Sequence, residues 1–146
     1  MTIFMYIQRR FESDFETHVL QMDGDSTCIK VIVENIDLSP KQLYTILMDD
    51  DYMRLTDDNI AEWKIVKKID EHNDISYYAA KSPIPLIAPR DFLNLRSYGQ
   101  IGENEYIIFM RATEDKDYPE REGYVRATVH VLGYYIVSSN GKTTLY

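Results

Sequence analysis

The stretch that most constrains the fold runs from Ser82 to Arg96, with the sequence SPIPLIAPRDFLNLR. Three of its first eight residues are prolines. Proline lacks a backbone N–H and restricts the residue before it, so neither a helix nor a central strand is expected there. The segment is nevertheless apolar, with Ile84 and Leu86 among its side chains, and it leads into an alternating segment at Asp91. A rigid apolar loop beside a strand suits a lid over a hydrophobic ligand, but also a loop packed on its own core.

Short alternating segments separated by turn residues make up most of the remaining chain. Asp23-Gly24 and Asn140-Gly141 are typical of two-residue hairpin turns. The pattern predicts about eight or nine strands joined mainly by hairpins, which implies an antiparallel meander. The expected strands cover residues 15–22, 27–35, 63–70, 75–81, 91–98, 105–112, 123–138 and 142–146, with a bend at Gly133 in the long one.

Two segments have helical features. Apolar residues within 1–12 recur at helical spacing and predict a short helix. A second helix is expected to begin at Ser39 as the N-cap, with Pro40 in the first helical position and Gln42 completing a capping box. It should end near Asp49–Arg54, where three successive aspartates oppose the helix dipole.

Length and charge narrow the class of protein. With 146 residues, the chain is predicted to form one domain, residues 1–146, with a sizeable core. Its net charge of −8 argues against a nucleic-acid partner, because phosphodiester backbones repel an acidic protein. The single cysteine, Cys28, permits no internal disulfide, and the apolar opening has its positive charges after it rather than before. These features predict a cytoplasmic protein.

Arg96 is the most informative charged residue. Phe92, Asn94, Arg96 and Tyr98 share one face of their expected strand. If that face is concave, Arg96 points into an apolar interior, where a guanidinium requires a ligand headgroup or a carboxylate. An arginine that faces solvent, or one paired with a carboxylate of a neighbouring strand, fits the same pattern. Several of the 12 tyrosines, Tyr78 among them, also lie on expected strands and need partners or a ligand wherever they face inwards.

Catalytic and metal-binding patterns are not found. The three histidines have no spacing that resembles metal ligation, and Cys28 has no second cysteine as a partner. The sequence also has no nucleophile-elbow serine, phosphate-binding glycine loop or calcium-loop spacing, and the aspartate clusters at 49–51 and 57–58 are interpreted as a solvated helix end. We therefore predict a protein that is not an enzyme and uses neither a metal nor a cofactor.

Several ordered motifs resemble the START lipid-transfer family. The clearest is Pro89–Arg96, which is similar to the family's proline-arginine-aspartate-aromatic sequence ending in arginine. Three further segments resemble family motifs in the same order: residues 51–60, 119–127 and 133–136. The first of them departs from the family pattern, because Leu55-Thr56 stand where a tryptophan is usual. The resemblance covers about residues 15 to 146.

The resemblance implies an α+β helix-grip fold, in which a curved antiparallel sheet with few helices wraps around a long C-terminal helix. The chain ends at Tyr146 with its last expected strand, so that helix is expected to be missing and the domain C-terminally incomplete. It also implies that residues 82–89 form a loop at the mouth of a lipid tunnel, with Arg96 inside. The acidic partner of the sterol-binding branch is expected just before the loop, where Lys81 and Ser82 stand instead.

These observations together predict non-covalent binding of a lipid, of the phospholipid or sterol class, in a hydrophobic groove, and its transfer between membranes. The residues expected to bind the ligand are Arg96, Asn94, Tyr98, Tyr78, Phe92, Ile84 and Leu86. The expected partners are a lipid, a transiently contacted membrane and a second copy of the chain, because an uncovered apolar sheet face favours association. One alternative is a protein-interaction module that uses the open sheet face, and another is a helix-grip hydrolase or cyclase.

Overall fold

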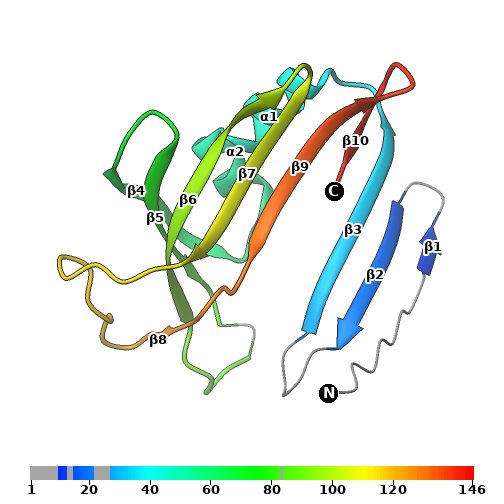
Figure 1. Ribbon diagram of the computed structural model, residues 1–146. Helices are drawn as coiled ribbons and strands as arrows, with labels where there is room; N and C mark the ends of the chain where they lie inside the picture. Colours follow the sequence, from blue (N-terminus) through cyan, green and yellow to red (C-terminus); the bar gives the residue numbers. More distant parts are fainter. Residues whose placement is uncertain (1–9, 13–14, 22–26, 83) are drawn as a thin grey trace, which may run out of the picture.

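The protein forms one open, curved antiparallel sheet with two short helices beside it, which confirms the α+β helix-grip prediction (Figure 1). This computed structural model describes residues 10–12, 15–21, 27–82 and 84–146. The strands are β1 (Arg10–Glu12), β2 (Phe15–Gln21), β3 (Thr27–Ile36), β4 (Ile60–Lys68), β5 (Asn73–Ala80), β6 (Arg90–Gly102), β7 (Glu105–Ala112), β8 (Val125–Arg126), β9 (Leu132–Ser139) and β10 (Lys142–Leu145). The helices are α1 (Pro40–Leu47) and α2 (Asp50–Thr56).

The sheet has the strand order β1-β2-β3-β10-β9-β7-β6-β5-β4. Each neighbour along this path is antiparallel, whereas β8 pairs in parallel with the start of β6. The last strand, β10, therefore closes against β3, and the meander from β4 to β9 forms the other half of the sheet. Neither helix in the described part of the chain is long and apolar enough to cross a membrane.

The predicted strands are confirmed with two corrections. β7 has the predicted bounds, while β6 continues four residues beyond the predicted end and turns only at Glu103 and Asn104. The long strand predicted for residues 123–138 was wrong, because this segment forms two strands, β8 and β9. β8 pairs with β6, whereas β9 pairs with β7. The chain therefore passes from one partner strand to another within this segment, which interrupts the strand.

The helix predicted for residues 1–12 was wrong where it can be compared. Arg10–Glu12 is a strand, with Phe11 opposite Glu16 of β2, because the edge of β2 supplies hydrogen-bonding partners for its backbone. The remaining residues of that prediction, like the Asp23-Gly24 turn, lie outside the described residues. The Asn140-Gly141 turn is confirmed, and both residues have the positive φ, 51° and 76°, that a type I′ turn requires.

The start of α1 is confirmed in detail. Ser39 Oγ accepts a hydrogen bond from the Gln42 N–H at 3.2 Å, and the Ser39 N–H donates to Gln42 Oε1 at 2.9 Å. The predicted helix end was wrong, because α1 stops at Leu47 and the aspartates begin α2 instead. Asp49 caps α2 by accepting from the backbone N–H groups of Asp51 and Tyr52, at 2.9 and 3.2 Å. Acidic side chains at the N-terminus of a helix interact favourably with the helix dipole.

The core lies on both faces of the sheet. On the inner face, which the helices cover, Leu43 of α1 packs against Tyr106 and Ile136, and a second cluster has Trp63, Ile108 and Met110 at its centre. On the outer face, Ile75, Tyr77, Ala79 and Leu93 pack under Tyr118 and Tyr124. These two tyrosines belong to residues 113–124, which cross the outer face and are called the strap below.

The helices leave the β2–β3 part of the inner face open. Val33 of β3 and Ile136 of β9 both pair with Leu145 of β10, so residues in phase with Val33 face inwards. Ile29 and Val31 are in that phase and are 63% and 40% exposed, and Phe15, opposite Val33, is 38% exposed. Phe15, Ile29 and Val31 therefore form an exposed apolar strip on the inner face of β2 and β3, called the apolar strip below.

Candidate functional site

Three cross-strand pairs between β5 and β6 form the centre of the candidate site. Residues directly opposite each other in an antiparallel ladder project to the same face of the sheet. Here that face is the inner one, because Tyr78 and Tyr98 join the inner cluster around Trp63. The pairs are, in order along the strands, Asp74 with Arg96, Ser76 with Asn94, and Tyr78 with Phe92.

The first pair is a buried ion pair. Arg96 Nε donates to Asp74 Oδ1 at 3.0 Å, and Arg96 Nη2 donates to Asp74 Oδ2 at 2.9 Å. Arg96 is 5% exposed and Asp74 is 1% exposed. A two-pronged guanidinium–carboxylate contact is the arrangement in which buried opposite charges compensate their loss of hydration best. The pair therefore adds a polar group to the inner face without adding net charge.

The ion pair also connects the sheet to α2. Asp50, the first residue of α2, accepts a hydrogen bond from Trp63 Nε1 at 2.8 Å and lies 3.7 Å from Arg96 Nη1. The Arg96 guanidinium in turn lies 5.9 Å from the centre of the Trp63 ring and 5.2 Å from that of Tyr98. The Tyr98 hydroxyl accepts a hydrogen bond from Lys68. These contacts fix the start of α2 over this end of the site.

The second pair is polar but unsatisfied. Ser76 and Asn94 are both fully buried, and Ser76 Oγ, Asn94 Nδ2 and Asn94 Oδ1 have no hydrogen-bond partner in the described residues. A buried polar group without a partner costs about 1–3 kcal/mol of stability. The two residues therefore mark a place on the inner face where a further hydrogen-bonding group would be favourable.

The third pair is aromatic. The rings of Tyr78 and Phe92 are stacked, with centroids 4.2 Å apart and planes inclined by 6°, and Trp63 stacks on the other side of Tyr78 with centroids 5.8 Å apart. Burial raises the pKa of Tyr78 to about 12, since the charged phenolate would lose its hydration. The three stacked rings form an aromatic wall across β4, β5 and β6.

The loop between β5 and β6, called the proline loop below, places the side chains of Ile84 and Leu86 in solvent. Ile84 and Leu86 are 55% and 105% exposed, so they are not buried with the Arg96 cluster. The Ile87 N–H donates to the Ile84 carbonyl at 3.3 Å, and Leu86, after Pro85, has a φ of +76°. This is a turn with proline second and a left-handed third residue, a position that favours glycine. Leu86 is therefore a strained, fully exposed apolar residue.

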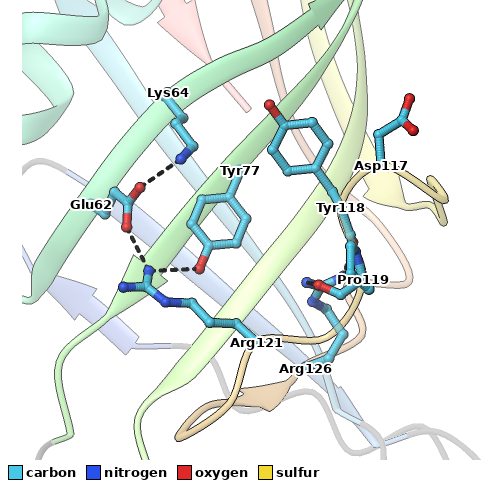
Figure 2. Close-up of a pocket in the computed structure, with 8 residues that line it drawn as sticks. All are labelled: Glu62, Lys64, Tyr77, Asp117, Tyr118, Pro119, Arg121 and Arg126. Atoms are coloured by element: carbon cyan, nitrogen blue, oxygen red, sulfur yellow. Dashed lines mark hydrogen bonds and ion pairs between the residues drawn. The ribbon is translucent and has the colours of Figure 1, made fainter.

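A separate pocket of about 320 Å³ lies on the outer face, between the sheet and the strap (Figure 2). Its lining residues are Glu62, Lys64, Tyr77, Asp117, Tyr118, Pro119, Arg121 and Arg126. Glu62 accepts from Lys64 at 2.8 Å and from Arg121 at 2.7 Å, and these cations lower the pKa of Glu62. The Arg121–Glu62 contact ties the strap to β4.

The deepest attachment of the strap segment is made by Arg126, just after the strap. Its Nε and Nη2 atoms bind the two carboxylate oxygens of Asp91, each at 3.0 Å, and Nη2 also donates to the Pro119 carbonyl at 3.1 Å. The carboxylate of Asp91 holds the pKa of Arg126 above its usual range. Asp91 and Arg126 belong to the motifs that carry the family resemblance, and in this structure they join the strap to β6.

The sequence did not reveal four residues of the candidate site, Asp50, Trp63, Asp74 and Ser76. The expected strand began at residue 75 and left Asp74 outside it, and the acidic partner implied by the family resemblance was expected near Lys81. The available signal was the alternation of Asp74, Ser76 and Tyr78, which mirrors Phe92, Asn94 and Arg96 in reverse order. Across the described residues, no three His, Cys, Asp or Glu side chains gather as metal ligands.

Comparison with known proteins places the chain in a family. The profile of the START domain matches residues 15–145. START domain-containing protein 10 of Mus musculus and of Homo sapiens is 32% identical over 124 residues, which cover 85% of this chain and 42% of each relative. The crystal structure of human STARD10 has a TM-score of 0.85 at 28% identity, covering 95% of this chain and 57% of that one.

The fold is shared more widely than the sequence. Human StAR-related lipid transfer protein 5 superposes with a TM-score of 0.82 at 17% identity, covering 95% of this chain and 68% of that structure. The chain spans less than half the length of the curated relatives it matches. The profile match over nearly the whole chain and the shared curved sheet lead to one conclusion: this chain belongs to the START domain family.

Proposed function

We propose that the protein binds a lipid non-covalently on the inner face of its sheet and carries it between membranes. Membership of the START family supports this role, as does the shared fold of StAR-related lipid transfer protein 5, a protein named for lipid transfer. The observation that carries the proposal is the composition of the inner face. An aromatic wall, a small buried polar group and an exposed apolar strip all lie on this same face of the curved sheet.

Apolar burial would supply most of the binding free energy, at about 25 cal/mol per Å². Tyr78 and Phe92 would contact the apolar body of the lipid, as would Ile29 and Val31 on the open half of the sheet. The polar end would lie near Asn94, Arg96 and Tyr98. The lipid would be of the phospholipid or sterol class, and no step of this function requires catalysis.

Transient membrane contact would be made by the proline loop. Ile84, Leu86 and Ile87 are exposed there, no charged residue interrupts them, and Lys81 and Arg90 flank the loop. Apolar side chains next to cations suit the boundary between acyl chains and lipid headgroups. Such a local contact would overcome the net negative charge of the chain, which disfavours long-range attraction to anionic membranes. Movement of the same loop would admit and release the lipid, in a cytoplasmic setting.

Transfer of a fluorescent phospholipid or sterol from donor to acceptor vesicles tests this function. The transfer rate should rise in proportion to the concentration of the protein. It should not depend on collisions between donor and acceptor vesicles. An unchanged rate with both lipids, at protein concentrations that exceed those of the labelled lipid, would contradict the proposal.

A second candidate function uses the same strip for a protein partner, and the exposed Phe15, Ile29 and Val31 favour it. Of the possible partners, a second copy of the chain is the one we predict. Light scattering after size exclusion distinguishes the two functions: a dimer that persists when lipid is supplied favours assembly, whereas a monomer with bound lipid favours transport.

A further inference from the structure

The outer-face pocket between the sheet and the strap has more free hydrogen-bond donors than free acceptors (Figure 2). Arg121 Nη1 donates to Glu62 Oε2 at 2.7 Å and to the Tyr77 hydroxyl at 3.4 Å. Lys64 Nζ donates to Glu62 Oε1 at 2.8 Å. A guanidinium group has five N–H donors and an ammonium group has three. Among the described residues, Arg121 Nε and Nη2 and the other protons of Lys64 have no hydrogen-bond partner.

Two tyrosine hydroxyls add to this excess of donors. Tyr77 is only 4% exposed, and Figure 2 shows its hydroxyl directed at the Arg121 guanidinium, from which it accepts. Neither the proton of this hydroxyl nor that of Tyr118 has an acceptor within the described part of the chain. A buried donor without an acceptor is unfavourable, so a group that brings oxygen acceptors to Tyr77 would be stabilised there.

The carboxylates of the pocket leave a positive charge beside Tyr77. Glu62 is shared by Lys64 and Arg121, so two cations and one carboxylate leave one positive charge in this cluster. Figure 2 shows Asp117 on the far side of the Tyr118 ring from Glu62. Free donors together with a positive charge favour an oxyanion, whose oxygens accept several hydrogen bonds at once.

The size and the rim of the pocket restrict the ligand. Its volume of about 320 Å³ is at the small end of the range for ligand pockets. Tyr118 and Pro119 supply apolar surface at one side. Glu120 and Glu122 are exposed on either side of Arg121 in the sequence and would repel an anionic membrane surface. The ligand that fits is a small soluble molecule with one oxyanion group and a compact apolar part.

We propose that Lys64, Tyr77 and Arg121 bind the phosphate or carboxylate group of a small soluble molecule. The site lies on the face of the sheet opposite the proposed lipid groove and is independent of the proposed function. Lys64 and Tyr77 belong to β4 and β5, whereas Arg121 belongs to the strap, so the ligand joins the strap to the sheet. Glu62 competes with the ligand, because it binds the same two cations.

Four probes test the site: phenyl phosphate, benzoate, inorganic phosphate and benzyl alcohol, compared at constant ionic strength. Binding is followed by the amide shifts of the strap in ¹H–¹⁵N spectra. Phenyl phosphate and benzoate, the two sources of an oxyanion, should give saturable shifts with a Kd on the order of 1 mM. Inorganic phosphate, which lacks a ring to contact Tyr118 and Pro119, should bind more weakly than phenyl phosphate. Benzyl alcohol, which has the ring without the charge, should give no saturable shift.

Matched variants separate this site from general attraction between charges. Arg121→Gln and Lys64→Gln should each weaken phenyl phosphate binding about five- to tenfold, because each removes a charged donor. Glu62→Gln should strengthen it about three- to tenfold, because both cations lose their competing carboxylate. Lys116→Gln, which removes the same charge from the strap but does not line the pocket, should change it by no more than about twofold.

The strap should stay in place in these variants. Lys67 binds Asp115 at 3.1 Å and Arg126 binds Asp91 at 3.0 Å, so it has attachments that do not involve the replaced side chains. Unchanged urea midpoints check this expectation.

Three results would overturn the inference. The first is the absence of a saturable shift with phenyl phosphate and benzoate at concentrations well above the expected Kd. The second is equal weakening by Lys116→Gln and Arg121→Gln, which would indicate non-specific attraction. The third is an unchanged or lower affinity in Glu62→Gln. None of them bears on lipid transfer between vesicles, which tests the opposite face of the sheet.

Discussion

Arg96 on β6 lies directly opposite Asp74 on β5, and its guanidinium binds both oxygens of that carboxylate, at 3.0 and 2.9 Å. Arg96→Leu should lower the free energy of unfolding by about 3–5 kcal/mol, because it leaves the buried Asp74 carboxylate unpaired. Asp74→Leu should lower the free energy of unfolding by a similar amount, because it leaves the buried Arg96 guanidinium unpaired. Urea denaturation of both variants measures these losses.

The double variant Asp74→Leu/Arg96→Leu is the control for this prediction. It removes both charges, so it should be more stable than either single variant. The double-mutant cycle gives the interaction free energy between the two side chains. A loss below about 1 kcal/mol for Arg96→Leu would mean that the pair contributes little to the fold.

The Asp91–Arg126 pair is predicted to hold the strap against β6. Arg126→Leu leaves the fully buried Asp91 without its cation and should cost about 3 kcal/mol. Hydrogen exchange should then accelerate within residues 113–124. Arg121→Leu is the matched control, since its partner Glu62 is solvent-accessible, and it should change strap exchange only slightly. Equal effects of the two variants would argue against a special role for Arg126.

Local sequence rules predicted much of the fold because local chemistry determines those parts. The capping box at Ser39 and the alternation that defines β7 need no knowledge of distant residues. The division of residues 123–138 into β8 and β9 could not be predicted in this way. It depends on which strand each half meets, and that choice is made by the whole sheet.

The candidate site was predictable on one strand only. The period of β6 placed Phe92, Asn94 and Arg96 on one face, and the structure puts all three on the inner side of the sheet. Their partners on β5 depend on the register across the loop of residues 81–89. A loop of that length does not fix a register as a two-residue hairpin turn does. Asp74 therefore could not be assigned to Arg96.

The stability of the protein should fall in alkaline solution as Tyr78 titrates. Burial raises the pKa of Tyr78 to about 12, above the value of about 10 in an unfolded chain. Below pH 10 both states keep the proton, so the contribution of Tyr78 to stability is fully present. As the pH rises from about 10 to about 12, the unfolded state releases the proton first, and the contribution is lost.

Tyr78→Phe should remove this part of the pH dependence. The measurement is the urea midpoint at about pH 9 and about pH 11.5 for the parent and the variant. The midpoint should fall less in Tyr78→Phe, although Tyr44, Tyr77 and Tyr134, whose pKa values burial also raises, will keep some alkaline sensitivity. Identical pH profiles for the two proteins would contradict the prediction.

Leu86 should contribute to membrane contact and not to the stability of the fold. Asparagine tolerates a φ of +76° better than leucine, so Leu86→Asn should leave the urea midpoint unchanged or raise it. Vesicle co-sedimentation should fall by about tenfold, since the variant loses the transfer free energy of one leucine side chain. Ile101→Asn, at the opposite end of β6, is the control and should sediment like the parent. Equal losses for both variants would indicate non-specific adsorption.

Native mass spectrometry of the protein, purified without detergent and mixed with a lipid extract, tests the central claim most directly. We predict a complex of one chain with one lipid molecule, which dissociates on collisional activation to give an intact lipid. A spectrum that shows only unliganded protein, at lipid concentrations that saturate a START domain of known ligand run in parallel, would contradict the account.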